Sequence, residues 1–247
     1  MKERIIGLIG AMPQELEHVV TRIEDLEVSE KGNREYYKGR LNGHRVVAVF
    51  SRGGKVAAAI TVTTLILEFE VDEVIFTGVA GAVNPDVRVG DIVIATRLIQ
   101  HDVDPRPLMP RYEIPFLGVT WFETDKGLVE KARRAATHLL AEEDKSEVRS
   151  KFGITSPRVI LGDIACGDQF IGSHQAVNQL SADIPSLQCV EMEGAAVAQV
   201  CYEYDIPFVV IRSISDNAND DALVDFMAYI DEVANHYSVE IVKRMLS

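Results

Sequence analysis

The sequence is short of basic residues and of long apolar runs, and each shortage excludes a class of protein. Its 247 residues include 25 Lys and Arg against 38 Asp and Glu, which gives a formal net charge of −13. This balance argues against nucleic acid and against an anionic membrane as partner. No apolar stretch reaches the roughly 18 residues that a membrane-spanning helix needs. The start, Met1–Gly10, is too short for a signal peptide, so we expect a cytoplasmic protein.

Cysteines and metal-ligand patterns are also scarce. The three cysteines have apolar neighbours and no C-x-x-C spacing: Cys166, Cys189 and Cys201. This arrangement favours buried free thiols over a disulfide or a zinc site. His101, Asp102 and Asp104 lie close together in the chain, but further spaced ligands are missing. We therefore expect neither a metal ion nor a cofactor.

The residues that are present predict an α/β fold. Apolar runs predict strands over 4–10, 36–41, 45–50, 71–82, 92–100, 158–166 and 207–216. The dipeptide Asn42-Gly43 predicts a hairpin turn between the second and third of these runs. Helices are expected from Pro13, from the 51–55 turn to about Leu67, over 125–151 with a polar break, from His174, and over 221–246. The expected fold is a single domain over 1–247, with a central mixed sheet flanked by helices.

Three carboxylates each follow an apolar run. Glu15 comes after the first predicted strand, Glu193 after Cys189–Val190, and Asp216 at the end of the last. Ligands of parallel sheets gather beyond the carboxyl ends of strands, so these side chains are expected to converge on one pocket. The alternative for Glu15 is a surface residue that complements a helix dipole.

A second acidic residue, Glu191, lies two positions before Glu193. The pattern leaves open whether one or both enter the pocket, and we favour a structural role for Glu191 as a partner of Arg212. Clustered carboxylates suit bond cleavage through an oxocarbenium-like transition state, with one acting as acid and another as base toward water. The residues alone thus indicate a hydrolase or transferase that acts on a polar, sugar-containing small molecule.

Three loops have two interpretations each. Phe170 follows a strand and either fills the core or offers a stacking surface to a planar ligand. The Gly-rich turn Ser51–Lys55 is not a P-loop; it either binds an anion through its N–H groups or simply starts a helix. The irregular, proline-rich segment 105–115 is expected to be a lid or a subunit contact. Ser173 is expected to cap the helix that begins near His174.

Several short segments together resemble the purine nucleoside phosphorylase and nucleosidase superfamily, and most closely its 5′-methylthioadenosine/S-adenosylhomocysteine nucleosidase family. They occur in the family's order and span nearly the whole chain: 7–15, 54–58, 77–81, 167–171, 190–193 and 212–216. No single segment is specific, but the set is. The resemblance implies irreversible hydrolysis that releases adenine from 5′-thio-ribosides.

The resemblance also implies roles for individual residues. Asp216 would protonate N7 of adenine with the help of Ser215, and Glu15 would be the base for the attacking water. Glu193 would hold the ribose 2′- and 3′-hydroxyls, with Met192 packed on the sugar.

The remaining implied roles concern the adenine, the 5′ end and the subunit contact. Phe170 would stack on adenine, and the Ile171 backbone would read its edge. Phe226 would line the 5′-substituent pocket, and Arg212 would help to organise the water site. The family implies a homodimer in which the 101–116 loop of one subunit completes the 5′ pocket of the other.

Three departures from the family pattern keep alternatives open. Val79 stands where many members carry Ser, which removes one side-chain contact to water or ribose. Arg52, in the 51–55 turn, could bind phosphate and thus favours a phosphate-dependent phosphorylase. The 105–111 segment leaves the 5′-substituent undefined, with aminofutalosine as one possibility. A nucleoside-binding protein without activity is the alternative outside the enzymes.

Overall fold

The computed structural model describes residues 3–142, 152, 154–216, 229 and 233–247, and it leaves the side chains of Gln14 and Glu15 undescribed. The described strands are β1 (Ile5–Gly10), β2 (Glu24–Lys31), β3 (Arg34–Leu41), β4 (His44–Phe50), β5 (Glu73–Ala82), β6 (Ile92–Gln100), β7 (Phe122–Glu123), β8 (Val159–Cys166), β9 (Leu187–Glu191) and β10 (Phe208–Asp216). The described helices are α1 (Pro13–Val20), α2 (Lys55–Phe69), α3 (Lys126–Glu142), α5 (His174–Asp183), α6 (Gly194–Glu203) and α8 (Asn235–Met245).

All the described strands join one mixed sheet. Its order is β10-β6-β8-β9-β5-β1-β4-β3-β2, with β7 added beside β6 and a further pairing between β10 and β5. That last pairing closes β5, β10, β6, β8 and β9 into a ring of strands, while β1 to β4 extend from β5 as an open sheet. Because β1, β4, β5 and β10 run parallel, their carboxyl ends lie at the same edge.

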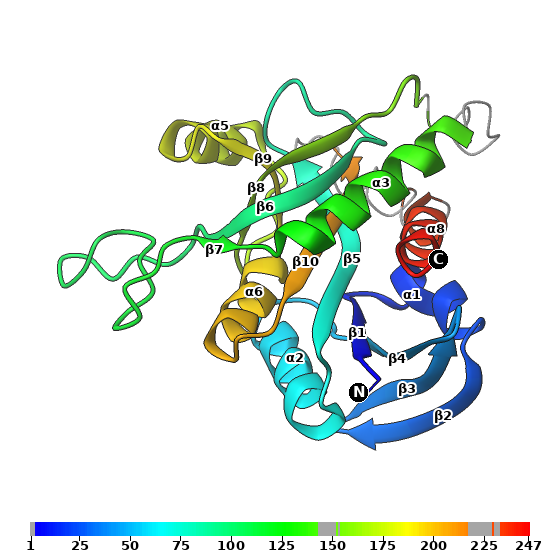
Figure 1. Cartoon of the computed structure of the whole chain (residues 1–247). Helices are drawn as coiled ribbons and strands as arrows, with labels where there is room; N and C mark the ends of the chain where they lie inside the picture. Colours follow the sequence, from blue (N-terminus) through cyan, green and yellow to red (C-terminus); the bar gives the residue numbers. More distant parts are fainter. Residues whose placement is uncertain (1–2, 143–151, 153, 217–228, 230–232) are drawn as a thin grey trace.

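Apolar cores lie on both faces of the sheet, which explains the continuous apolar runs in the sequence. In β1, Ile5 and Ile9 pack into the core beneath α2 and α6, whereas Ile6 and Leu8 face the core formed with α1, α3 and α8. Alternate residues of a strand point to opposite faces, so a strand covered on both sides must be apolar throughout. Figure 1 shows α2 and α6 on one side and α1, α3 and α8 on the other.

Most of the predicted elements are confirmed. The hairpin turn at Asn42-Gly43 joins β3 to β4, and both turn residues have positive φ, as a type I′ turn requires. Ser173 caps α5 by accepting a hydrogen bond from the Ala176 N–H. The edge strand β2 was not predicted, because five of its eight residues are charged and it is exposed on both faces. The expected helices over 125–151 and 221–246 are described only as α3 and α8.

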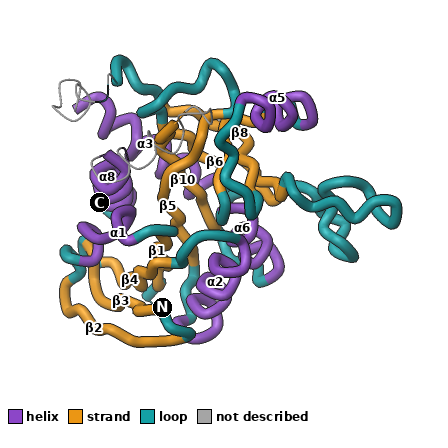
Figure 2. Tube along the Cα trace, turned by 180° about the vertical axis from the view of Figure 1, so that it is seen from behind, coloured by secondary structure: helices purple, strands orange, loops and turns teal. Residues whose placement is uncertain are grey.

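The segment between β6 and β7 projects from the body of the molecule, as both Figure 1 and Figure 2 show. Leu108 and Phe116 in this projecting loop, residues 101–121, are 89% and 95% exposed. Within this loop, Arg111 pairs with Asp183 of α5 at 2.9 Å. No described helix combines the length and the hydropathy needed to cross a membrane.

Candidate active site

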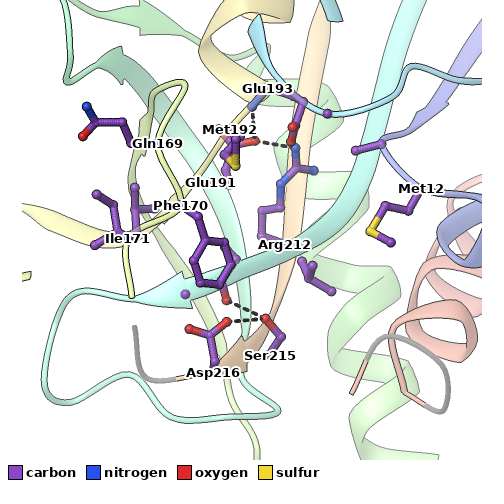
Figure 3. Close-up of a pocket in the computed structure, with 16 residues that line it drawn as sticks. Met12, Gln169, Phe170, Ile171, Glu191, Met192, Glu193, Arg212, Ser215 and Asp216 are labelled. Carbon is purple, nitrogen blue, oxygen red and sulfur yellow. Dashed lines mark hydrogen bonds and ion pairs between the residues drawn. The ribbon is translucent and has the colours of Figure 1, made fainter. Parts of the chain in front are cut away.

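One pocket lies where the strand ends meet. It encloses about 160 Å³, and all eight predicted site residues whose side chains are described line it. The wall residues are Ala11, Met12, Gly53, Val79, Ala80, Gly81, Gln169, Phe170, Ile171, Val190, Glu191, Met192, Glu193, Arg212, Ser215 and Asp216. Figure 3 shows Met192 and Glu193 toward one end, Ser215 and Asp216 toward the other, and Phe170 between them.

The end of β10 turns two consecutive side chains into this pocket. In a regular strand Ser215 and Asp216 would face opposite sides of the sheet. The register against β5 shifts between Ile214 and Asp216, so that Ser215 is an extra residue in the strand. Such a bulge re-aims side chains. As a result, the Ser215 hydroxyl lies 2.7 Å from Asp216 Oδ2, and both residues are almost fully buried.

The junction between β9 and α6 is built around Glu191. Its carboxylate accepts hydrogen bonds from the N–H groups of Glu193 at 3.1 Å and Gly194 at 2.7 Å. It also pairs with Arg212 Nη2 at 2.7 Å. The pairing predicted from the sequence is therefore present, and Glu191 fixes the start of α6 while it contributes to the pocket wall. A Cβ at position 194 would approach both Glu191 oxygens at 3.0–3.1 Å, which explains the glycine.

Glu193 contacts the Gly-rich turn before α2. Its Oε1 accepts a hydrogen bond from the Gly54 N–H at 2.7 Å. The turn thus binds an anion through its N–H groups, as one interpretation of the sequence proposed, and this anion is a carboxylate of the protein itself. Gly54 has a φ of 92°, a conformation that only glycine adopts without strain. Neighbouring Met192 lines the same wall.

The loop after β8 supplies the apolar wall. Phe170 is 47% exposed and lines the pocket, so the core-filling interpretation is wrong. Ile171 lies beside it, and Val79 contributes from β5. Ring and aliphatic groups that remain accessible at a strand end provide a surface for a planar ligand.

Three predicted residues are not among the pocket residues, two of them because the structure does not describe their side chains. Glu15 lies in the first turn of α1, just after the wall residue Met12, but its side chain is not among those described. Phe226 lies outside the described residues. Arg52 does not line the pocket; its guanidinium donates instead to the Asn33 carbonyl at 2.7 Å. Its proposed role in phosphate binding therefore has no support in this geometry.

The cysteines are buried, and their thiols are protonated. All three are free thiols, as the sequence predicted. Burial, together with nearby Glu191 and Glu193, raises the pKa of Cys166 far above its usual value. Burial likewise raises the pKa of Cys189 and of Cys201. A protonated thiol is a poor nucleophile, so we assign no chemical role to these cysteines.

Several wall residues were missed by sequence reasoning. Ala11 and Met12 follow β1 and line the pocket, but neither was among the predicted site residues. The strand-end rule that selected the carboxylates applies to these small and apolar residues equally. They were missed because only residues with distinctive chemistry were considered.

The family follows from a comparison with known proteins. The family model described as the phosphorylase superfamily matches residues 5–247. The chain belongs to this superfamily. Among curated superfamily members, the 5′-methylthioadenosine/S-adenosylhomocysteine nucleosidase of Shewanella denitrificans is 39% identical over 239 residues, which cover 96% of each chain.

Solved structures of superfamily members agree in fold. A nucleosidase of the same description from Colwellia psychrerythraea, in complex with adenine, superposes with a TM-score of 0.88 at 33% identity, covering 99% of this chain and 95% of that one. The futalosine hydrolase of Helicobacter pylori has a TM-score of 0.83 at 33% identity, covering 98% and 97%. The predicted fold class, an α/β fold with a mixed sheet flanked by helices, is confirmed.

Proposed function

We propose that the protein hydrolyses the N-glycosidic bond of 5′-methylthioadenosine and S-adenosylhomocysteine, releasing adenine and the 5′-thio-ribose. The observation that carries the proposal is the pocket with Asp216 and Ser215 at one end, Glu193 at the other and Phe170 between them. In an adenine nucleoside, a planar base that can be protonated is joined to a sugar that carries hydroxyl groups. The base fits beside Phe170 and Asp216, and the sugar fits beside Glu193. Curated relatives that align over 96% of both chains carry this activity in their names.

The base occupies the end formed by β10 and the loop after β8. Phe170 stacks on the adenine ring, and the backbone of Ile171 contacts the edge of the base. Asp216 acts as general acid and delivers its proton to N7, which makes adenine a neutral leaving group. The Ser215 hydroxyl, 2.7 Å from Asp216 Oδ2, holds the carboxyl in the orientation for transfer.

The sugar occupies the opposite end. Glu193 accepts hydrogen bonds from the ribose 2′- and 3′-hydroxyls, and Met192 packs on the ring. As the C1′–N9 bond breaks, positive charge develops on the sugar, and the attraction of the Glu193 carboxylate increases. Glu193 therefore contributes more in the transition state than in the ground state, which is the condition for raising the rate.

Water completes the reaction. Its oxygen attacks C1′ while Glu15, in the first turn of α1, accepts a proton from it. The pair Arg212–Glu191 forms the nearby wall that organises the water. In sum, one proton passes from Asp216 to adenine and one from water to Glu15, so the two carboxyl groups must exchange a proton through solvent before the next cycle.

We prefer hydrolysis to phosphorolysis because the described pocket residues include few cationic side chains that could bind phosphate. Among the described residues that line the pocket, Arg212 is the only cationic side chain, and it is engaged with Glu191. Arg52 is directed to a backbone carbonyl outside the pocket. A phosphate co-substrate would require cations that face the sugar.

The test is product analysis with methylthioadenosine in buffers with and without phosphate. We expect equal rates of adenine release and free 5-methylthioribose in both. Strict dependence on phosphate, with a sugar 1-phosphate as product, would establish a phosphorylase instead. Binding of the nucleoside without turnover would indicate the non-catalytic alternative. Parallel reactions with S-adenosylhomocysteine and aminofutalosine rank the 5′-substituents, the latter because a futalosine hydrolase shares the fold.

We propose further that the protein acts as a cytoplasmic homodimer of single-domain subunits. Along α2, Val56, Ile60 and Leu67 are 71%, 47% and 58% exposed, and their helical spacing places them on one face. Leu108 and Phe116 add exposed apolar area on the projecting loop. Such surface is typical of an interface. Buried free thiols fit a reducing compartment.

The dimer places residues 101–116 of one subunit near the 5′ pocket of the other. Light scattering should give twice the mass of the chain, and Ile60→Asp should give monomers with reduced activity. A monomeric wild type with full activity would contradict the dimer without affecting the hydrolysis.

A further inference from the structure

The start of α2 is capped by carboxylates from distant parts of the chain. The first turn of α2 contains no acidic residue, and its N-cap Gly54 has no side chain to offer. Instead, the Gly54 N–H donates to Glu193, and the next N–H, of Lys55, donates to Asp168 Oδ1 at 2.8 Å. The unpaired N–H groups and the positive end of the helix dipole favour anions at this position.

Asp168 belongs to a closed ring of hydrogen bonds that joins three segments. Its own N–H donates to Asp102 Oδ2 at 2.9 Å, and Asp102 Oδ1 accepts from Lys55 Nζ at 2.7 Å. The Lys55 N–H returns to Asp168 and completes the ring. Lys55 Nζ also donates to Gln100 Oε1 at 3.1 Å, which ties the ring to the end of β6.

The ring connects the two ends of the pocket. Asp168 directly precedes the wall residues Gln169, Phe170 and Ile171 on the base side. Lys55 directly follows Gly54, whose N–H contacts Glu193 on the sugar side. The Asp168 side chain therefore holds the turn whose N–H group contacts Glu193. Asp168 also lies at the start of the loop that carries Phe170.

We propose that Asp168 is a positioning residue, which acts through the start of α2 to orient Glu193 toward the sugar. It does not contact the reacting atoms. When Asp168 loses its carboxylate, the Lys55 N–H loses its acceptor, and the Gly54 N–H is no longer held on Glu193 Oε1. This inference rests on the proposed function, in which Glu193 holds the ribose hydroxyls.

The variants separate the carboxylate's charge from its hydrogen bond. Asp168→Ala removes the acceptor, and kcat on methylthioadenosine should fall about tenfold, the loss expected for one hydrogen bond between an N–H and a charged group. Asp168→Asn keeps an oxygen for the Lys55 N–H and should stay within about threefold of the wild type. The matched control is Asp125→Ala, which removes the carboxylate that accepts from Leu128 N–H at 2.8 Å at the start of α3.

The decisive comparison uses a substrate without the hydroxyls. On 5′-methylthio-2′,3′-dideoxyadenosine Glu193 has nothing to hold, so Asp168→Ala should lower kcat less than about twofold. Asp125→Ala should reduce thermal stability but leave the kcat ratio of the two substrates unchanged. An equal loss for Asp168→Ala on both substrates, or no loss on either, would overturn the positioning role.

Amide hydrogen exchange provides a readout that does not require turnover. The peptide that contains Gly54 and Lys55 should exchange faster in Asp168→Ala than in the wild type, and at the wild-type rate in Asp125→Ala. Unchanged exchange would overturn the proposal by itself. If the wild type cleaves neither nucleoside while exchange responds as expected, the proposed function fails. The role of Asp168 in holding the Gly54–Lys55 turn is still supported in that case.

Discussion

The buried pair of Glu191 and Arg212 leads to a quantitative prediction about stability. The side chains are 2% and 1% exposed, and their charged atoms lie 2.7 Å apart. Removing one charge from such a pair leaves the other uncompensated, which costs about 3–5 kcal/mol. We expect Glu191→Gln to lie near the lower limit, because the guanidinium keeps the Ile211 carbonyl at 3.2 Å and the Phe76 ring at 4.1 Å.

Removing the other charge, in Arg212→Met, should lower the free energy of unfolding by a similar amount. In Arg212→Met the carboxylate keeps the N–H groups of Glu193 and Gly194. The double variant carries no charge at either position and should be less destabilised than the sum of the two singles. A coupling of about 2 kcal/mol is within the range for side chains in direct contact.

Urea unfolding at a fixed protein concentration measures these free energies, because a dimer makes stability depend on concentration. Circular dichroism and the fluorescence of the single tryptophan should give coincident transitions if unfolding is two-state. The control is Arg134→Met, whose partner Glu130 and own side chain are exposed, with an expected loss below about 0.5 kcal/mol. A loss for Glu191→Gln as small as the control's, or strict additivity in the double variant, would refute the reasoning.

Three further predictions concern the pocket and its surroundings. Asp216→Asn should lower kcat at least about 10²-fold in steady-state assays, the low end for a lost proton transfer, and a near-wild-type rate would remove Asp216 from that role. Gly194→Ala should lower the urea midpoint and destabilise the fold by about 1–3 kcal/mol, because its Cβ would crowd the fixed carboxylate of Glu191. An unchanged midpoint would show that the residues around position 194 can shift to accommodate a methyl group. Burial raises the pKa of Asp102, but its hydrogen bonds to Lys55 and to a backbone N–H outweigh burial and leave the pKa lowered from 3.8. A carboxyl group with a lowered pKa stabilises the fold only while it is ionised. At pH 7, Asp102→Asn should therefore have a lower melting temperature than the wild type, with a loss of up to about 1 kcal/mol in the free energy of unfolding. This difference should close as the pH falls below 3.8, and a pH-independent gap in melting temperature would contradict the assignment.

The sequence was informative wherever a pattern has one physical cause. The apolar run of β1 exists because both faces of the strand are covered, and Asn42-Gly43 has few uses other than a tight turn. Asp216 could be placed beside the ends of β1 and β5 because β10 runs parallel to these strands, so that all three end at one edge. Each of these inferences needs only local information and a general rule of packing.

Other features depend on contacts that no local pattern encodes. The bulge at Ser215 arises from the register between β10 and β5, and nothing in the β10 sequence alone marks it. Similarly, the Gly-rich turn before α2 predicts an anion, but the identity of that anion as Glu193 requires the three-dimensional fold. The strand β2 has no apolar face, so its pairing with β3 is its only signature.

The position of β10 has a consequence for how the protein folds. This strand lies between β5 and β6, yet it follows both of them by more than a hundred residues in the chain. During synthesis, the ring of strands therefore stays open until the last of its members emerges. Pairings between such distant segments form slowly, because the intervening chain must be ordered first. Since β10 also carries Asp216, the recovery of activity after denaturation would report the closure of the ring rather than any earlier stage.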